Sequence, residues 1–246
     1  MTIRQLGKRT LRRAGLNVSK LINVPFGVDA FDDVAGLAGE VSVVFDIGAN
    51  IGQTVVRVRR ALPHVQIYSF EPVPSTYAKL VANVGSMRGV DCVQSAVGDA
   101  EGEIEITESL ISGHNTIHLS AKPESPTITV PLTTVDAFAT ERGVDIVDLL
   151  KIDTEGYETA VLQGAKGLLE TGRVRFVLAE CDFTHRPEEP HGAFFDIADT
   201  LLPLGFRVVA TYVGGVDGDG WRWGDALFMM PSGPRAVTCS PHAVPR

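Results

Sequence analysis

Four acidic residues follow two apolar runs of the sequence and could together bind a cation. Asp153 and Glu155 follow the run DLLKI, and Glu180 and Asp182 follow the run VRFVLA. In an open α/β sheet the carboxyl ends of the strands border the ligand crevice, so we expect these side chains at one site. Carboxylate oxygens suit Mg²⁺, which lowers the pKa of a bound alcohol. We therefore predict a magnesium site formed by Asp153, Glu180 and Asp182. The alternative is that Glu155 or Glu158 caps a helix and pairs with lysines.

Histidines are candidates for the base that removes the proton of such an alcohol. His114 lies in a polar segment that could cover the crevice, and His185 lies shortly after the second apolar run. His118 belongs to the same polar segment as His114. The candidate catalytic residues are therefore His114, Asp153 and His185, although each histidine could equally be a surface residue. Lys151 lies within a buried strand pattern, so we expect it to form a structural ion pair.

The sequence VVFDIGANIGQT brings glycines close together between an apolar run and a helical pattern. A dinucleotide fingerprint needs glycines where Asn50 and Gln53 stand, so NAD is the weaker candidate ligand. Asp46, Gly48, Asn50 and Gly52 instead occupy every second position, and the glycines let a ligand lie close to the backbone. In the alternative interpretation Asp46 caps the helix and the glycines serve packing.

Glu71 ends the next apolar run, where its carboxylate could accept hydrogen bonds from both hydroxyls of a ribose. Asp46 could reach a water molecule or the amino group of an amino-acid part of the ligand. An acidic surrounding also favours a cationic ligand. The spacing of Asp46, Gly48, Asn50 and Gly52 resembles the first motif of class I methyltransferases, and this resemblance implies S-adenosylmethionine, a cationic nucleoside without a pyrophosphate.

Five stretches together resemble the FkbM family of S-adenosylmethionine-dependent O-methyltransferases. They are DIGANIGQT, SFEPVPSTYAKLVAN, QSAVGDAEGEIEI, TTVDAF and DLLKIDTEGYETAVLQGA. The resemblance runs from about Val43 to Cys181 and implies a Rossmann-like class I methyltransferase sheet, S-adenosylmethionine as cofactor, and methylation of a hydroxyl, often on sugars or natural products. The candidate cofactor-binding residues are Asp46, Gly48, Asn50, Gly52, Thr54, Glu71, Ala96 and Asp153.

We predict an O-methyltransferase whose acceptor is a hydroxyl of a sugar, glycan or glycolipid; a polyketide or peptide is the alternative acceptor. An aliphatic hydroxyl is a poor nucleophile at neutral pH, so a base or a metal must assist. Trp221 and Trp223 lie in a glycine-rich segment, where they either stack on a pyranose ring or pack across strands. A nicotinamide-dependent oxidoreductase and a non-catalytic binding module are the alternatives from other classes.

Short β-branched runs alternate with helical patterns, which predicts a doubly wound α/β fold with a seven-stranded, mostly parallel sheet. The expected strands are residues 41–46, 65–70, 90–95, 148–153, 174–180, 206–212 and 226–230. The segment 102–134 between the third and fourth strands alternates at both ends, which predicts an inserted β-hairpin or lid. We also expect Ser75 to cap a helix, and one helix to run from about Tyr157 to Gly172.

Composition and charge limit the partners of the chain. Its 246 residues carry a formal net charge of −8, so an acidic body argues against nucleic acid. Residues 1–40 begin with a basic stretch, predicted to be a helical arm that contacts an anionic membrane surface or simply faces solvent. Residues 41–231 are predicted to form the methyltransferase domain, and residues 232–246 a flexible tail. We expect a cytoplasmic protein, because neither a membrane span nor a secretory leader is evident.

Overall fold

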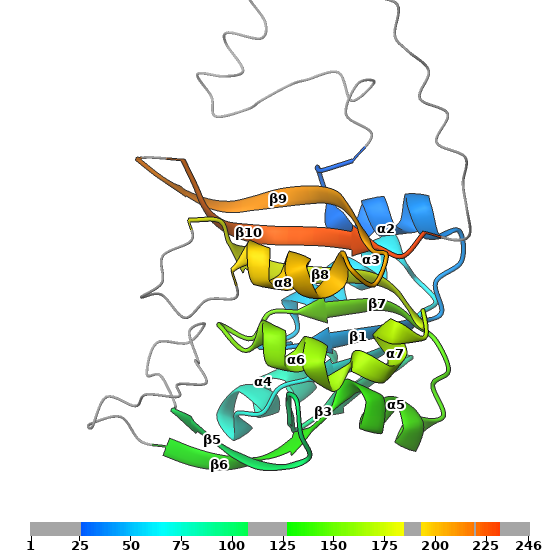
Figure 1. The fold of residues 1–246 in the computed structure, drawn as a ribbon. Helices are drawn as coiled ribbons and strands as arrows, with labels where there is room; N and C mark the ends of the chain where they lie inside the picture. The colour runs from blue at the N-terminus through cyan, green and yellow to red at the C-terminus, as the bar shows by residue number, and fades with distance from the viewer. Residues whose placement is uncertain (1–25, 108–126, 185–192, 219, 232–246) are drawn as a thin grey trace, which may run out of the picture.

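Seven strands form one sheet in the order β3-β2-β1-β7-β8-β10-β9 in the computed structural model, which describes residues 26–107, 127–184, 193–218 and 220–231 (Figure 1). The strands are β1 (Val43–Ile47), β2 (Gln66–Phe70), β3 (Val90–Val93), β7 (Val147–Ile152), β8 (Val174–Asp182), β9 (Arg207–Asp217) and β10 (Gly220–Met229). All neighbours pair in parallel except β10, which runs antiparallel to β8 and β9. The predicted α/β class with a seven-stranded, mostly parallel sheet is confirmed.

Helices cover both faces of this sheet (Figure 1). In the described part of the chain one face carries α2 (Ala30–Ala38), α3 (Gln53–Ala61) and α4 (Pro74–Val84). The other face carries α5 (Val135–Arg142), α6 (Glu158–Gly164), α7 (Lys166–Glu170) and α8 (Phe194–Leu201). Successive strand side chains point to opposite faces, so Val44 packs with the first group and Phe45 with the second. Because both faces of the sheet are buried, side chains of either orientation are mostly apolar, and the strands form continuous apolar runs in the sequence.

The first turn of α4 differs from the expected one. The helix begins at Pro74, with Val73 at the N-cap position, and no side chain caps it. Proline suits the first helical position because its φ is already helical and its missing N–H would have no partner there. The expectation that Ser75 caps this helix is therefore wrong.

The single helix expected after Tyr157 is also wrong, because it is divided at Ala165 into α6 and α7. The carboxylate of Asp136, in α5, accepts hydrogen bonds from the backbone N–H groups of Gly167 and Leu168 at 2.6 and 3.0 Å. A side chain from another helix thus satisfies the free donors at the start of α7. Local periodicity carries no signal for this break.

The inserted segment forms a second, three-stranded sheet. Its strands, in the order β4-β6-β5, are β4 (Ala96–Val97), β5 (Gly102–Thr107) and β6 (Thr127–Thr133). β5 and β6 pair antiparallel, which confirms the two arms of the predicted hairpin. Ile106 and Val130 pack against Val73 and Ala96, and this cluster fixes the small sheet beside α4. Residues 108–126, the rest of the predicted lid, lie outside the described residues.

Acidic side chains attach α2 to the main body. Asp29 caps the helix by accepting a hydrogen bond from the N–H of Phe31 at 2.9 Å. Asp33 is buried and accepts a hydrogen bond from the Tyr212 hydroxyl of β9 at 2.6 Å.

Residues 1–25 and 232–246 lie outside the described residues, so the membrane-contacting arm and the flexible tail stay predictions.

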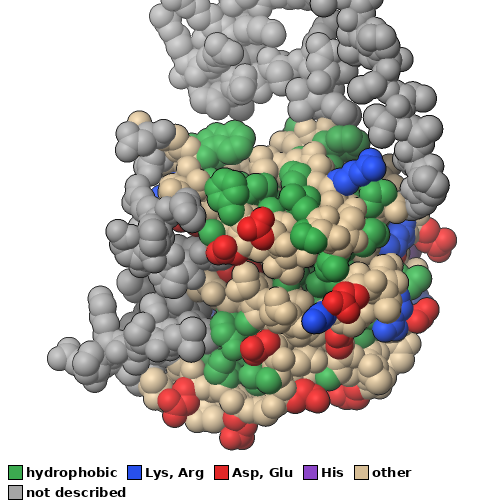
Figure 2. Space-filling model, in the orientation of Figure 1, with side chains coloured by type: hydrophobic (Ala, Val, Ile, Leu, Met, Phe, Trp, Pro, Cys, Tyr) green, Lys and Arg blue, Asp and Glu red, His purple; other side chains and the backbone are tan. Residues whose placement is uncertain are grey.

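The surface agrees with the negative net charge of the chain. On the face shown in Figure 2, acidic side chains gather along the edge formed by β5, β6 and α5. A surface of this kind repels anionic groups such as phosphate. No helix in the described ranges is long and apolar enough to cross a membrane.

Candidate active site

A cavity of about 590 Å³ lies at the carboxyl ends of β1, β2, β7 and β8. Its walls come from the turn after β1, the ends of these strands, the small sheet and β10. An open α/β sheet binds its ligands at this edge. The residues predicted from sequence that line it are Gly48, Asn50, Thr54, Glu71, Ala96, Asp153, Glu180 and Asp182.

Gly48 lies where the turn after β1 passes the end of β7. Its φ is +78°, and a Cβ atom at this position would overlap the backbone carbonyl of Asp153. The N–H groups of Gly48 and Ala49 both donate to the carbonyl oxygen of Phe70, at 3.1 and 2.8 Å. Only glycine allows three strand ends to meet this closely, and the result is a bare stretch of backbone in the cavity wall.

Gly52 has a different role from Gly48. Its φ is +94°, and a Cβ atom here would lie 2.9 Å from Val84 Cγ1, in α4. Gly52 is not among the described residues that line the cavity, so this glycine serves the packing of α3 against α4. The packing alternative raised by the sequence fits Gly52, whereas the ligand-approach interpretation fits Gly48.

Glu71 is held in place by two backbone donors. It is 5% exposed; Oε2 accepts a hydrogen bond from the N–H of Asn50 at 3.1 Å, and Oε1 accepts one from Val73 at 3.0 Å. Burial raises the pKa of this carboxyl group, although the two N–H donors oppose the rise. A carboxylate oxygen has two acceptor sites, so each oxygen can still accept from a ligand hydroxyl. The Asn50 backbone reaches Glu71 because Asn50 itself adopts a φ of +49°.

An apolar wall stands beside Glu71. Val73, Val97 and Ile106 line the cavity there together with Ala96. Of these the sequence identified only Ala96, since nothing in the local pattern shows that β5 of the small sheet would reach the cavity. Buried aliphatic side chains next to a fixed carboxylate suit a flat nucleobase attached to a ribose.

Lys151 joins two carboxylates at the base of the cavity. Its Nζ lies 2.9 Å from Asp153 Oδ2 and 3.7 Å from Asp46 Oδ1, which confirms the expected ion pair. Burial opposes the charge on Lys151, but the two carboxylates raise its pKa above the ordinary value. Burial raises the pKa of Asp46 to about 6, with the Lys151 charge acting in the opposite direction.

Asp46 was expected to contact the ligand, and its position differs from that expectation. It is fully buried in β1 and is not among the described residues that line the cavity. Asp153 lines the cavity and is partly exposed, with Lys151 between the two acids. Asp46 therefore lies in the buried layer beneath the cavity, and Asp153 faces the cavity.

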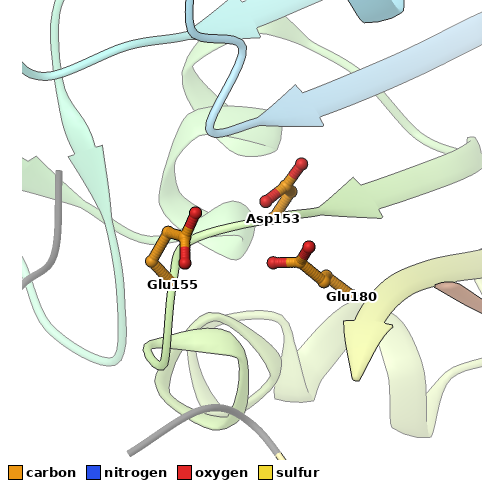
Figure 3. A group of neighbouring side chains, drawn as sticks. All are labelled: Asp153, Glu155 and Glu180. Carbon is orange, nitrogen blue, oxygen red and sulfur yellow. The ribbon is translucent and has the colours of Figure 1, made fainter. Parts of the chain in front are cut away.

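Three carboxylates converge where β7 and β8 end. Asp153, Glu155 and Glu180 each offer one oxygen, and these oxygens lie within 4.8 Å of one another. Figure 3 shows the three side chains around a common space. Burial and the neighbouring Asp153 and Glu155 charges raise the pKa of Glu180 to about 9. Burial opposes ionisation of Asp153, but the Lys151 charge lowers its pKa overall. Concentrated negative charge of this kind favours a bound cation.

Two acids near this group have local roles. Asp182, expected as a metal ligand, accepts hydrogen bonds from the N–H and hydroxyl of Thr184 and is not one of the three grouped acids. Glu158 is 1% exposed and accepts from the N–H groups of Thr154 and Gly156 at 3.0 and 3.1 Å. Glu158 therefore shapes the turn that presents Glu155, and its bonds go to N–H groups before α6 and do not cap that helix. Glu155 takes the place expected for Asp182 because that turn gives it a φ of +54°.

The predicted histidine bases cannot be placed relative to the cavity. His114, His118 and His185 all lie outside the described residues. Sequence reasoning also missed Gln53, Arg57 and Arg222 in the lining. Arg57 lies one helical turn after Gln53, so the period of α3 was the only available signal for these two residues.

Comparison with known proteins gives a family. A model of the family described as "Methyltransferase FkbM domain" matches residues 46–208. The chain is 27% identical over 193 residues to the 2-O-methyltransferase NoeI of Sinorhizobium fredii, covering 72% of this chain and 77% of that protein. It is 31% identical over 201 residues to the 31-O-demethyl-FK506 methyltransferase FkbM of Streptomyces tacrolimicus, covering 68% and 74%.

A solved structure shares the fold. The METTL16 MTase domain matches with a TM-score of 0.50 and 13% sequence identity, over 93% of this chain and 79% of that one. The seven-stranded sheet with its antiparallel β10 is the class I methyltransferase fold. Identity at this level carries the fold and not the acceptor.

Proposed function

The chain belongs to the FkbM family and is an S-adenosylmethionine-dependent O-methyltransferase, and we propose that its acceptor is a hydroxyl of a sugar, glycan or glycolipid. The observation that carries the proposed cofactor position is Glu71, whose two oxygens are fixed by Asn50 and Val73 at the rim of an apolar wall. A ribose whose two hydroxyls donate to this carboxylate would lie with its base against Val73, Val97 and Ile106. S-adenosylmethionine, when bound, supplies an electrophilic methyl group.

The chain's own residues then have distinct tasks. The bare backbone at Gly48 leaves room for the amino-acid part of the cofactor, and Asp153 supplies a carboxylate beside it. Lys151 holds Asp153 through the 2.9 Å ion pair, so the orientation of this carboxylate is set before any ligand binds. The acceptor hydroxyl must approach from the β8 and β10 side, because the cofactor occupies the side of β1 and β2.

We further propose that Asp153, Glu155 and Glu180 hold Mg²⁺. Three carboxylate oxygens within 4.8 Å of one another suit a hard cation, and a bound ion would lower the pKa of the acceptor hydroxyl. His114 and His185 are the alternative proton acceptors, as predicted from the sequence. Calorimetric titration of Mg²⁺ into the protein tests the site without an acceptor, and activity that persists in EDTA would contradict the metal.

Cofactor binding and acceptor class are tested separately. Titration with S-adenosylhomocysteine, followed by calorimetry, is expected to show one site per chain; absence of heat and of a thermal shift would contradict the cofactor site. Transfer of label from methyl-labelled S-adenosylmethionine to a panel of glycosides, polyketides and peptides then identifies the acceptor. Label found only on a polyketide or peptide would overturn the sugar proposal and leave the methyltransferase activity intact.

A further inference from the structure

Trp223, in β10, lines the cavity and is 46% exposed. Its indole lies over Gly214 and Gly215 of β9, with the six-membered ring at Gly214 and the five-membered ring at Gly215. A Cβ atom at either glycine would overlap the indole. The backbone of β9 therefore supports one face of the ring.

The strands around Trp223 are adapted to this ring. The pairing of β9 with β10 shifts register on both sides of Trp223. At Gly224 a Cβ atom would overlap the carbonyl oxygen of Tyr212, so a third glycine is needed for the strands to approach here. Glycine inside a strand weakens it and commonly marks a bulge or a close approach. The fold thus gives up strand stability to seat an aromatic ring that stays half exposed.

The neighbours of Trp223 are acids of the same cavity. In the antiparallel pairing of β10 with β8, Trp223 lies opposite Asp182 and Asp225 lies opposite Glu180. Directly paired residues point to one face of the sheet, so Trp223 and Asp182 share a face, with the indole extending over β9 and Asp182 on β8 at the other side of β10. Asp182 lies outside the group of three acids and lines the cavity.

Trp221, two residues earlier, provides an internal contrast. It is 53% exposed, its ring contacts Phe183 at 6.0 Å between centroids, and it is not among the described residues that line the cavity. Cross-strand and surface packing accounts for Trp221. For Trp223, cross-strand packing on β9 accounts for one face of the ring only, and the rest of this half-exposed residue borders the cavity.

We propose that Trp223 determines acceptor specificity. Its ring binds the apolar C–H face of an uncharged, polyhydroxylated ring, and Asp182 accepts a hydrogen bond from one of the ring hydroxyls. The inference rests on the proposed function, because it places the acceptor in the half of the cavity that the cofactor leaves open. It goes beyond the proposed function in two respects: it names the residue that selects the acceptor, and it specifies that the acceptor is uncharged.

The charge of the cavity favours an uncharged acceptor. Among its described lining residues six are acidic and three are basic. Two of the basic residues are already paired, Lys151 with Asp153 and Arg57 with Asp29 at 3.3 Å. In protein that holds no Mg²⁺, an acidic ring such as a uronide would therefore meet an excess of like charge.

The test uses saturation-transfer NMR on the full chain with bound S-adenosylhomocysteine and without Mg²⁺. The probes are methyl β-glucopyranoside, methyl α-mannopyranoside and methyl β-glucuronide. We expect the unmodified protein to give signals from the two uncharged glycosides. Relative to these, the signals should be at least fivefold weaker with Trp223→Ala and unchanged with Trp221→Ala. The signals with Trp223→Phe should lie between those of Trp223→Ala and the unmodified protein. The glucuronide signal is expected to be at least fivefold weaker than that of the glucoside. For a glycoside that is methylated, Trp223→Ala should raise KM about tenfold with kcat within twofold.

Each contrary result has a definite meaning. Equal loss in Trp223→Ala and Trp221→Ala, or no signal from either uncharged glycoside, overturns the role of Trp223. A glucuronide signal as strong as that of the glucoside overturns the selection against charge. Calorimetry with S-adenosylhomocysteine must give the same affinity within twofold for all variants. If the unmodified protein does not bind it, the proposed function fails instead, and the glycoside spectra of the protein alone still test Trp223.

Discussion

The two halves of the cavity are built in different ways. The half proposed for the cofactor, around Glu71 and here called the cofactor half, is made by backbone groups: the N–H groups of Asn50 and Val73 fix the carboxylate, and Gly48 exposes main chain. The acceptor half, around Glu180 and Trp223, is made by side chains that strand pairing brings together. A site built from backbone tolerates few substitutions, whereas a site built from side chains can change its ligand without changing the fold.

Gly48→Ala should have the largest effect, because it places a methyl group against the backbone of β7 at a positive φ. We expect a loss of about 3 kcal/mol or more in the free energy of unfolding, measured by urea denaturation. Gly143→Ala is the matched control: its φ is +64°, and no described atom lies within 4 Å of the added Cβ. That variant should lose only about 1–2 kcal/mol. Equal losses would show that close strand packing is not what requires Gly48.

Asp46→Asn tests the buried layer beneath both halves. The pKa of Asp46 in the folded protein is about 6, above the 3.8 of a free aspartate side chain, so its stabilising contribution is complete below pH 3.8 and is lost as the pH rises through 6. The pH-dependent contribution of Asp46 to the free energy of unfolding is at most about 3 kcal/mol. The unfolding free energy of the variant, measured from pH 3.5 to 7.5, should fall less steeply than that of the unmodified protein. Parallel pH profiles would contradict a buried, titrating Asp46.

Glu71→Ala tests the cofactor half directly. Loss of the carboxylate should weaken S-adenosylhomocysteine binding 10- to 100-fold, or about 1.4–2.7 kcal/mol, measured by calorimetry. Glu71→Gln keeps one acceptor oxygen, so its affinity for S-adenosylhomocysteine should lie between those of Glu71→Ala and the unmodified protein. Glu103→Ala, at an exposed position on β5, is the control and should bind normally. Affinity within twofold in Glu71→Ala would remove the basis for the proposed cofactor position.

Glu180→Gln and Asp182→Asn test which acids of the acceptor half bind Mg²⁺, and the expected change in Tm is the smallest of the effects predicted here. Mg²⁺ at ten times its Kd should raise the Tm of the unmodified protein by about 3–6 °C. Glu180→Gln should abolish this rise, because Glu180 is one of the three grouped carboxylates. Asp182→Asn should retain it, because Asp182 lies outside that group. Loss of the rise in both variants in a thermal-shift assay would restore the ligand set predicted from the sequence, and a rise that persists in Glu180→Gln would contradict both ligand sets.

Much of the cofactor half could be predicted from residues 43–72 alone. An apolar run, a turn with Gly48 and Gly52, and an acid at the end of the next run are local patterns with local causes. They placed Glu71 and Asn50 in the cavity lining, and the alternation at both ends of segment 102–134 predicted its hairpin arms. The different roles of the two glycines could not be predicted, because each is set by contact with another element.

By itself the sequence determined the order of strands and helices, the glycine turn, and the acids that end β2, β7 and β8. Only the tertiary structure decided which of these acids meet: a positive φ at Glu155 brings that residue beside Glu180, while Asp182 bonds to Thr184. Only strand pairing set Trp223 over Gly214 and Gly215 and opposite Asp182. The reason is physical: periodicity and turn chemistry act over a few neighbouring residues, whereas register and close packing join residues far apart in the chain.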